Sequence, residues 1–207
     1  MALSGVVILF TTLFPIFSYE WEVSQKYPIL ISPLVDSRKG SFKFSEKDYT
    51  KAQNWFDNSQ NIEDEAGEFK YFSLSIPKLE IQGATVVIGG NDLSDHLIQF
   101  PGTALPGETG NSVIFGHSIL PQYFDPENYL AIFSTLPSLQ KGDMVIIDYE
   151  GIIYKYTVRD MFEVTPSDIQ ILEQSVASSY LTLVTCTPPG HPLKPRRLIV
   201  RAELMQD

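Results

Sequence analysis

Residues 144–164 have the sequence MVIIDYEGIIYKYTVRDMFEV, two apolar runs separated by a short polar turn. Apolar or aromatic side chains from Ile152 to Val158 alternate with mostly polar ones, as in a β-strand with one buried face. Residues 148–151 have the composition of a hairpin turn. The stretch therefore predicts two antiparallel strands, Met144–Tyr149 and Ile152–Val164.

The same pattern of short β-branched or aromatic runs, interrupted by Gly, Pro, Asn and Asp, extends from Tyr71 to Leu204. It is typical of an all-β domain. The expected strands are Phe72–Ile76, Thr85–Ile88, Ser112–Phe115, Met144–Tyr149, Ile152–Val164, Tyr180–Thr185 and Arg197–Leu204. Helices are expected over Asn128–Leu136 and, as a short element, from Thr165, where a capping side chain precedes Pro166.

The N-terminal third differs in composition. Residues 1–19 carry no charge and are just long enough to cross the roughly 30 Å hydrocarbon layer, which predicts a membrane anchor, with a buried core helix as the alternative. Residues 20–70 are polar and predict a stalk or linker ahead of a folded domain at 71–207. Within that linker, the aromatic pair Trp55-Phe56 predicts a packing anchor on the domain or a cover over a groove.

The bulk composition narrows the class of protein. A chain of 207 residues, 43% hydrophobic and 19% charged, accommodates one domain with an appendage and excludes wholesale disorder. The formal net charge of −10 argues against nucleic acid as a partner, because phosphate binding requires clustered Lys and Arg. The single cysteine, Cys186, excludes an intrachain disulfide and a cysteine-based zinc cluster.

Cys186 is a candidate nucleophile, with an inert buried thiol as the alternative. A free thiol is mostly protonated at neutral pH and needs a basic or cationic neighbour. Cys186 follows the apolar run 181–185, and His117 follows the run 112–116 in the same way. Because strand ends deliver side chains rigidly to a cleft, the two residues are a candidate catalytic pair.

A cation follows the Pro-rich loop 187–195, where Arg196 and Arg197 begin another apolar run. A strand, a loop and a returning strand would bring one arginine back beside Cys186. A guanidinium there would stabilise the oxyanion of acyl transfer. The pattern leaves open which arginine does so, because neighbouring residues of a strand point to opposite faces.

These stretches resemble the motifs of one family. Residues 182–186, Thr-Leu-Val-Thr-Cys, resemble the sortase signature Thr-Leu-x-Thr-Cys, and Arg197 begins a strand similar to the one that follows it in sortases. Residues 111–117 are similar to the stretch with the sortase histidine. The similarity also covers residues 100–107, 139–143 and 164–168. The run Thr-Cys-Thr-Pro-Pro-Gly resembles the pilin-assembling class C branch, but the stalk lacks an Asp-Pro-aromatic lid motif, so the subclass stays open.

The resemblance implies a closed eight-stranded β-barrel and a cysteine transpeptidase. Such enzymes cleave a sorting signal, typically Leu-Pro-x-Thr-Gly, through a thioacyl intermediate that an amine resolves. By position, Cys186 would attack the scissile carbonyl, and His117 would serve as general acid and base. Arg197 would stabilise the oxyanion or hold the substrate, with Arg196 as the alternative.

Further residues are candidates by their place near these motifs. Thr185 and His191 would contact substrate, with a strand-lining hydroxyl and an exposed loop histidine as the alternatives. No cofactor or metal is expected. Some sortases bind calcium through loop carboxylates, but the spacing of Glu163, Asp168 and Glu173 fits no EF-hand loop and predicts a solvated acidic surface.

The resemblance also implies partners and a location. The substrates would be surface proteins that bear a sorting signal, and the amine acceptor a wall precursor or a pilin lysine. The protein would cross the cell membrane once, in contact with lipid through its N-terminal segment, with the catalytic domain outside. Two alternatives to transpeptidation stay open: a cysteine endopeptidase that releases its product by hydrolysis, and a non-catalytic membrane-tethered binding module.

Overall fold

The computed structural model describes Phe14, Ser18 and residues 48–57, 70–174, 177–191 and 193–205. Apart from those residues, the predicted membrane segment 1–19 and linker 20–70 lie outside the described part of the chain. Within that part, no helix has both the length and the apolar character needed to cross a membrane.

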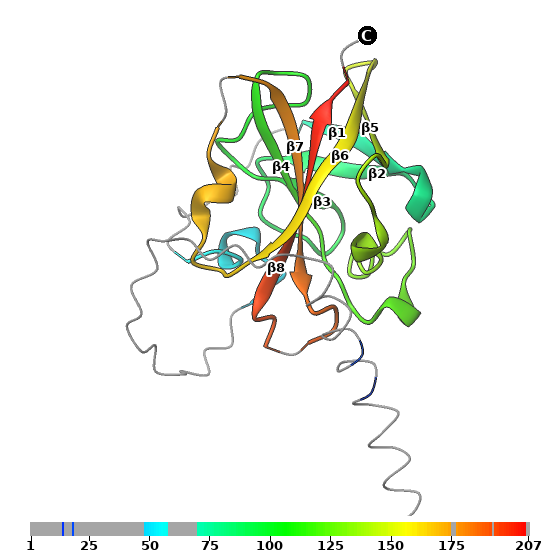
Figure 1. The fold of residues 1–207 in the computed structure, drawn as a ribbon, viewed down its shortest axis with the longest axis vertical. Helices are drawn as coiled ribbons and strands as arrows, with labels where there is room; N and C mark the ends of the chain where they lie inside the picture. Colours follow the sequence, from blue (N-terminus) through cyan, green and yellow to red (C-terminus); the bar gives the residue numbers. More distant parts are fainter. Residues whose placement is uncertain are drawn as a thin grey trace, which may run out of the picture.

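The described residues form a closed barrel of eight strands, ordered β1-β2-β3-β4-β7-β8-β6-β5 (Figure 1). The strands are β1 (Tyr71–Ile76), β2 (Ile81–Ile88), β3 (Leu97–Gln99), β4 (Gly110–Phe115), β5 (Met144–Tyr149), β6 (Ile152–Val164), β7 (Ser179–Thr187) and β8 (Arg196–Leu204). Strands β2 and β3, and likewise β4 and β7, pair in parallel, and the other neighbours are antiparallel. The predicted all-β class and closed eight-stranded barrel are confirmed.

The hairpin between β5 and β6 matches its prediction at every boundary. Its two loop residues, Glu150 and Gly151, have φ angles of 53° and 79°. Positive φ at both positions is what a two-residue type I′ turn requires. Strand β3 was not predicted, because three residues are too few to show a period, and its pairing with β2 is non-local.

The connections contain short 3-10 segments. They are η1 (Ala52–Asn54), η2 (Pro77–Leu79), η3 (Pro121–Tyr123), η4 (Leu136–Ser138) and η5 (Ile169–Leu172). The short helix expected from Thr165 is represented by η5. The helix expected over Asn128–Leu136 is wrong: this stretch forms successive turns, and the Phe133 N–H donates to the His117 carbonyl at 2.9 Å instead of continuing a helix.

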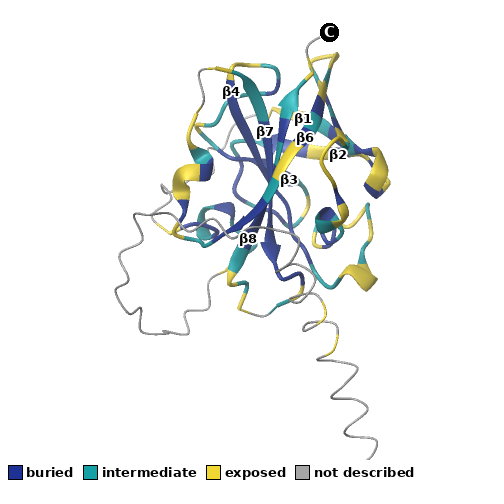
Figure 2. Ribbon diagram, viewed as in Figure 1, coloured by how far each residue is buried: buried dark blue, intermediate teal, exposed yellow. Residues whose placement is uncertain are grey.

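Two apolar clusters pack on opposite faces of the barrel wall. The first receives side chains from all eight strands and fills the interior, with Leu181 and Leu183 of β7 among them. The second lies on the outer face of the wall and includes Val184 and Cys186. The strands that separate the two clusters are buried along much of their length (Figure 2). Alternate residues of β7 thus serve two different clusters.

Residues 48–57, called the strap below, cover the outer cluster. Ala52, Trp55 and Phe56 of the strap are buried in it. The strap therefore belongs to the folded domain, although the sequence placed it in the linker. Its polar residues concealed this packing, and only the aromatic pair indicated it.

Candidate active site

Cys186 and Arg197 lie opposite each other on neighbouring strands. Cys186 is the last residue but one of β7, and it pairs with Arg197 of β8 in antiparallel register. Residues directly opposite in such a pair project from the same face of the sheet. Arg197 therefore shares the outer face with Cys186, and Arg196, which pairs with Thr187, takes the inner face. The structure thus distinguishes between the two arginines.

His117 follows β4 and lies alongside the end of β7. The parallel register of these strands runs to Phe115 opposite Val184, and the Gly116 N–H then donates to the Val184 carbonyl at 3.1 Å. Beyond that point, the Ser118 hydroxyl donates to the Cys186 carbonyl at 2.8 Å. These bonds on either side of His117 hold it next to the cysteine strand.

The Thr185 hydroxyl also links β7 to the chain that follows β4. It is fully buried and donates to the Gly116 carbonyl at 2.8 Å. Its hydrogen bond therefore supports the main chain beside His117, as a strand-lining hydroxyl would. Sequence reasoning missed Ser118, because a serine after a histidine carries no signal until the facing strand is known.

The Arg197 side chain is completely buried. Its Nε donates to the Trp55 carbonyl at 3.0 Å, and a terminal nitrogen donates to the carbonyls of Lys194 and Arg196 at 2.8 and 3.0 Å. The guanidinium carbon lies 5.5 Å from the centre of the Tyr49 ring and 5.6 Å from that of Trp55. Such distances allow cation–π attraction, so strap residues hold this cation through both a carbonyl and aromatic rings.

Arg196 has a different partner. It forms a 3.0 Å ion pair with Glu163, a carboxylate with 1% exposure that also accepts a 2.9 Å hydrogen bond from the Thr187 hydroxyl. Arg196 thereby compensates a buried charge on the inner face, which explains why two consecutive arginines begin β8. The structure does not bring Arg196 to the face of Cys186.

The predicted acidic surface is wrong for Glu163 and Asp168, which are both buried. An Asp168 oxygen accepts hydrogen bonds from the Thr165 N–H and hydroxyl at 3.0 and 2.8 Å. Asp168 thus has a local partner, whereas Glu163 has partners on β7 and β8, which sequence spacing could not reveal. Glu173 is exposed as expected. Nowhere in the described ranges do three His, Cys, Asp or Glu side chains converge as a metal site would require.

His191 lies in the loop between β7 and β8. Its Nδ1 accepts a hydrogen bond from the Leu193 N–H at 3.1 Å, within the loop itself. A Cβ atom added at the neighbouring Gly190 would lie 2.7 Å from the Leu120 side chain. The loop tip therefore packs closely against the chain that leaves His117, but the contact seen for His191 is local.

The family model for the sortase domain matches residues 74–205. The chain belongs to the sortase family. A curated sortase A of Streptococcus agalactiae serotype III (strain NEM316) is 37% identical over 73 residues, which are 35% of this chain and 28% of that protein. The chain thus matches less than a third of the length of this sortase relative.

Solved sortase structures share the fold. A Clostridium perfringens sortase D5 transpeptidase is 29% identical with a TM-score of 0.57, over 67% of this chain and 83% of that chain. A lid mutant of sortase A from Corynebacterium diphtheriae is 28% identical with a TM-score of 0.58, over 70% and 75%. A pilus-related sortase C of Group B Streptococcus is 30% identical with a TM-score of 0.57, over 66% and 68%.

Burial controls the protonation of this candidate site. It lowers the pKa of His117 to about 4, with a smaller contribution from the charge of Lys194. It raises the pKa of the Cys186 thiol, against the opposing effect of Arg197 and Lys194. Both groups are therefore neutral at pH 7 in this closed arrangement. The His117 Nε2 is buried and has no hydrogen-bond partner among the described residues.

The strap crosses the candidate site from one loop to another. On one side it meets the loop between β2 and β3: the Ala52 N–H donates to the Asn91 carbonyl, and the Leu93 N–H donates to the Thr50 carbonyl, both at 2.8 Å. On the other side the Asp57 N–H donates to the Pro166 carbonyl at 2.8 Å, in the connection between β6 and β7. The strap thus spans the outer cluster between two loops.

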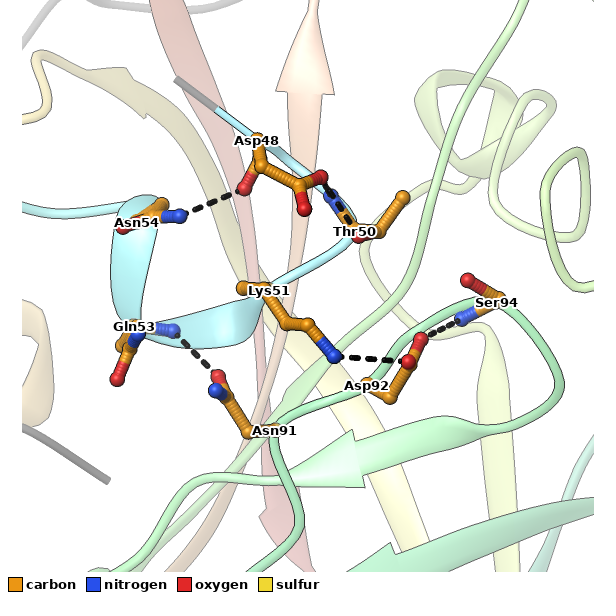
Figure 3. A network of polar contacts seen from close by, with 8 residues as sticks. All are labelled: Asp48, Thr50, Lys51, Gln53, Asn54, Asn91, Asp92 and Ser94. Carbon is orange, nitrogen blue, oxygen red and sulfur yellow. Dashed lines mark hydrogen bonds and ion pairs between the residues drawn. The ribbon is translucent and has the colours of Figure 1, made fainter. Parts of the chain in front are cut away.

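Side chains reinforce the first of these attachments (Figure 3). Lys51 forms a 2.8 Å ion pair with Asp92, and the Gln53 N–H donates to the Asn91 side chain at 3.1 Å. Inside the strap, the Trp55 indole donates to the Tyr49 carbonyl at 2.8 Å. The Trp55 ring lies 5.6 Å from that of His117, centre to centre, so the strap covers the histidine as well as Arg197.

Proposed function

We propose that the chain is a cysteine transpeptidase that cleaves a sorting signal of the Leu-Pro-x-Thr-Gly type and transfers the carboxyl fragment to an amine. The main support is the register of β7 and β8, which pairs Cys186 with Arg197 on one face of the sheet. The join between β4 and β7, which holds His117 beside them, adds a base. Thiol, imidazole and guanidinium are the groups that acyl transfer through a thioester requires.

The proposed reaction begins with a neutral thiol and a neutral imidazole. His117 takes the thiol proton as the sulfur attacks the scissile carbonyl, and Arg197 donates hydrogen bonds to the resulting oxyanion. His117 then gives that proton to the leaving amine, which departs and leaves a thioester on Cys186. An incoming amine attacks the thioester and passes its proton to His117, and the new amide is released as the thiol is restored.

This reaction requires the strap to open. Cys186, His117 and Arg197 are 2%, 5% and 0% exposed, so a peptide cannot reach them in the closed arrangement. The Trp55 carbonyl also accepts from the Nε of Arg197, so the strap competes with an oxyanion for this guanidinium. We therefore propose that the strap is a movable cover. A similar solved structure is described as a lid mutant of a sortase, which fits such a cover in this family.

The proposed location and partners follow from the same assignment. The apolar segment 1–19 would anchor the protein in the cell membrane, and residues 20–47 would carry the domain outside it. The substrates would be surface proteins with a sorting signal, and the acceptor a wall precursor or a pilin lysine. Pilus-related sortase C among the similar structures is consistent with a pilin acceptor. We propose no cofactor.

The test uses the full-length protein in detergent with a panel of sorting-signal peptides, each with and without triglycine. We expect mass spectrometry to detect an acyl adduct on Cys186 and a triglycine-ligated product, and neither with Cys186→Ala. Hydrolysis alone across a range of amines would instead identify a cysteine endopeptidase. The absence of adducts and turnover, even with a strap-weakening variant such as Trp55→Ala, would favour a binding module.

A further inference from the structure

The connection between β6 and β7 forms one wall beside the cysteine. Its η5 segment contributes Ile171, which is buried in the same outer cluster as Val184 and Cys186. The Pro166 carbonyl of this connection also receives the strap at Asp57. A peptide that replaces the strap on this face would therefore lie against the η5 wall.

Asn111 links the η5 wall to strands β4 and β7. It lies on the face of β4 that also presents Val113 and Phe115 to the outer cluster, because alternate strand residues share a face. Its buried Nδ2 donates to the Ile171 carbonyl at 2.8 Å, and its Oδ1 accepts the Thr182 hydroxyl of β7 at 2.6 Å. One buried amide thus joins β4, β7 and η5.

Gln174 adds a second amide to the join. Its Oε1 accepts from the N–H groups of Ala104 and Asn111 at 3.1 and 2.9 Å. Its Nε2 donates to the carbonyls of Asn111 and Leu172 at 3.2 and 2.9 Å. The side chain therefore links three segments: the loop before β4, β4 itself, and the β6–β7 connection.

The position of Gly110 allows Gln174 to approach this closely. A Cβ atom at Gly110 would lie 2.8 Å from the Gln174 Oε1 and 2.7 Å from the Ala104 Cβ. The φ angle of Gly110 is 137°, in the region that favours glycine. The Gln174 side chain can therefore approach the start of β4 because residue 110 has no side chain.

We infer that Asn111 and Gln174 are positioning residues that hold the η5 wall in place for the sorting signal before it binds. This inference rests on the proposed function, because it concerns binding at the same candidate site. A connection without this amide clamp would have to be ordered when the peptide binds, and that loss of conformational entropy would weaken binding. Neither amide bonds to Cys186, His117 or Arg197, so the effect concerns KM and not kcat.

The first test compares Gln174→Leu with Gln82→Leu in the 207-residue chain. Gln82 is exposed on β2, outside the η5 wall, and no hydrogen bond of its side chain is observed within the described residues. With a peptide that the wild type turns over, we expect Gln174→Leu to raise KM about tenfold, as the loss of one or two net hydrogen bonds would. We expect kcat to change by less than about twofold, which corresponds to less free energy than one net hydrogen bond contributes.

Two further results of this comparison are informative. Gln174→Glu keeps the acceptor for the two N–H groups but turns a carboxylate oxygen towards the Asn111 and Leu172 carbonyls, so its KM should also rise above that of the wild type. Gln82→Leu should leave both constants unchanged. An unchanged KM for Gln174→Leu, or an equal rise for Gln82→Leu, would overturn the clamp.

The second test does not depend on activity. Amide hydrogen exchange of the resting protein should become faster at Ile169–Glu173 in Gln174→Leu, while exchange in β7 and β8 stays unchanged. If the wild type turned over no sorting peptide but this local change occurred, the proposed function would fail and the clamp would stand. If the enzyme were active but exchange in the wall were unchanged, the clamp alone would fail.

Discussion

The two faces of β7 are covered in different ways. On the inner face, Leu181 and Leu183 pack among side chains from every strand of the closed barrel. On the outer face, Val184 and Cys186 lie beneath the strap, which main-chain hydrogen bonds attach to the β2–β3 loop and to the β6–β7 connection. Both faces of β7 are buried, but only the outer face is covered by one short segment, the strap.

This difference indicates which cover can move. Opening the inner face requires the strand ladders of the barrel to separate, which amounts to global unfolding. Opening the outer face requires the strap to lose a few hydrogen bonds and the packing of Trp55 and Phe56. Local openings of that kind cost less than the full stability of a domain. The barrel therefore supplies a rigid floor, and the proposed opening of the strap would control access to it.

The largest expected effect distinguishes the two arginines on the two faces. Arg197→Gln should lower the rate of acyl-enzyme formation by about 10²–10³-fold, because the oxyanion loses its donor. Arg196→Gln should leave this rate nearly unchanged but should reduce the free energy of unfolding by about 3 kcal/mol, because the buried Glu163 loses its ion pair. Adduct formation measured by mass spectrometry, together with urea unfolding, would check both. The reverse pattern would contradict the β7–β8 register.

The next largest effect is expected when the packing of the strap is weakened. Trp55→Ala should increase the rate of Cys186 alkylation by iodoacetamide on the order of 10²-fold, because a buried aromatic side chain no longer stabilises the closed arrangement. Tyr123→Ala removes an exposed aromatic side chain outside the strap and should not change the rate. Unchanged alkylation in Trp55→Ala would mean that the strap is a permanent wall.

A smaller effect concerns the pH dependence of the outer face. Because the pKa of His117 falls from 6.5 to about 4 on folding, the unfolded chain binds a proton in this interval that the folded protein does not. The free energy of unfolding should therefore decrease as the pH falls from 6.5 towards 4, by about 2 kcal/mol at pH 5. The charges of Lys194, Asp48 and Asp92 act on the same imidazole, the first lowering its pKa and the other two raising it.

The measurement is urea unfolding of the wild type and His117→Gln at pH 7 and pH 5. The variant should lack this part of the pH dependence, while other titrating groups act on both proteins alike. The same dependence in both proteins would contradict a buried neutral histidine under the strap.

The smallest effect comes from the charged attachment of the strap. Lys51→Ala removes the ion pair with Asp92, whose partners are 32% and 49% exposed. We expect only a two- to threefold faster alkylation of Cys186, because exposed ion pairs contribute about 0.5 kcal/mol. Added salt should reduce the difference between the variant and the wild type. Lys78→Ala, which removes an ion pair with Asp143 elsewhere on the barrel, is the matched control.

The sequence predicted the elements whose signal is local. Strands β5 and β6 and the turn between them were correct to the residue, because alternation and turn composition lie within one stretch. The prediction of a helix failed for residues 128–136, where the Phe133 N–H donates to the His117 carbonyl. Strand β3 was missed because it is held by pairing with β2 and β4. Both failures concern backbone groups whose partners are distant in the sequence.

By itself, the sequence determined the all-β class and brought Cys186, His117 and an arginine to strand ends, because periodicity and strand termini are local properties. Only the tertiary structure decided between Arg196 and Arg197, since that choice depends on the register of β7 against β8. It alone also placed Trp55 against Arg197, a contact across 142 residues of chain. Packing between such distant residues leaves no periodic pattern in the sequence.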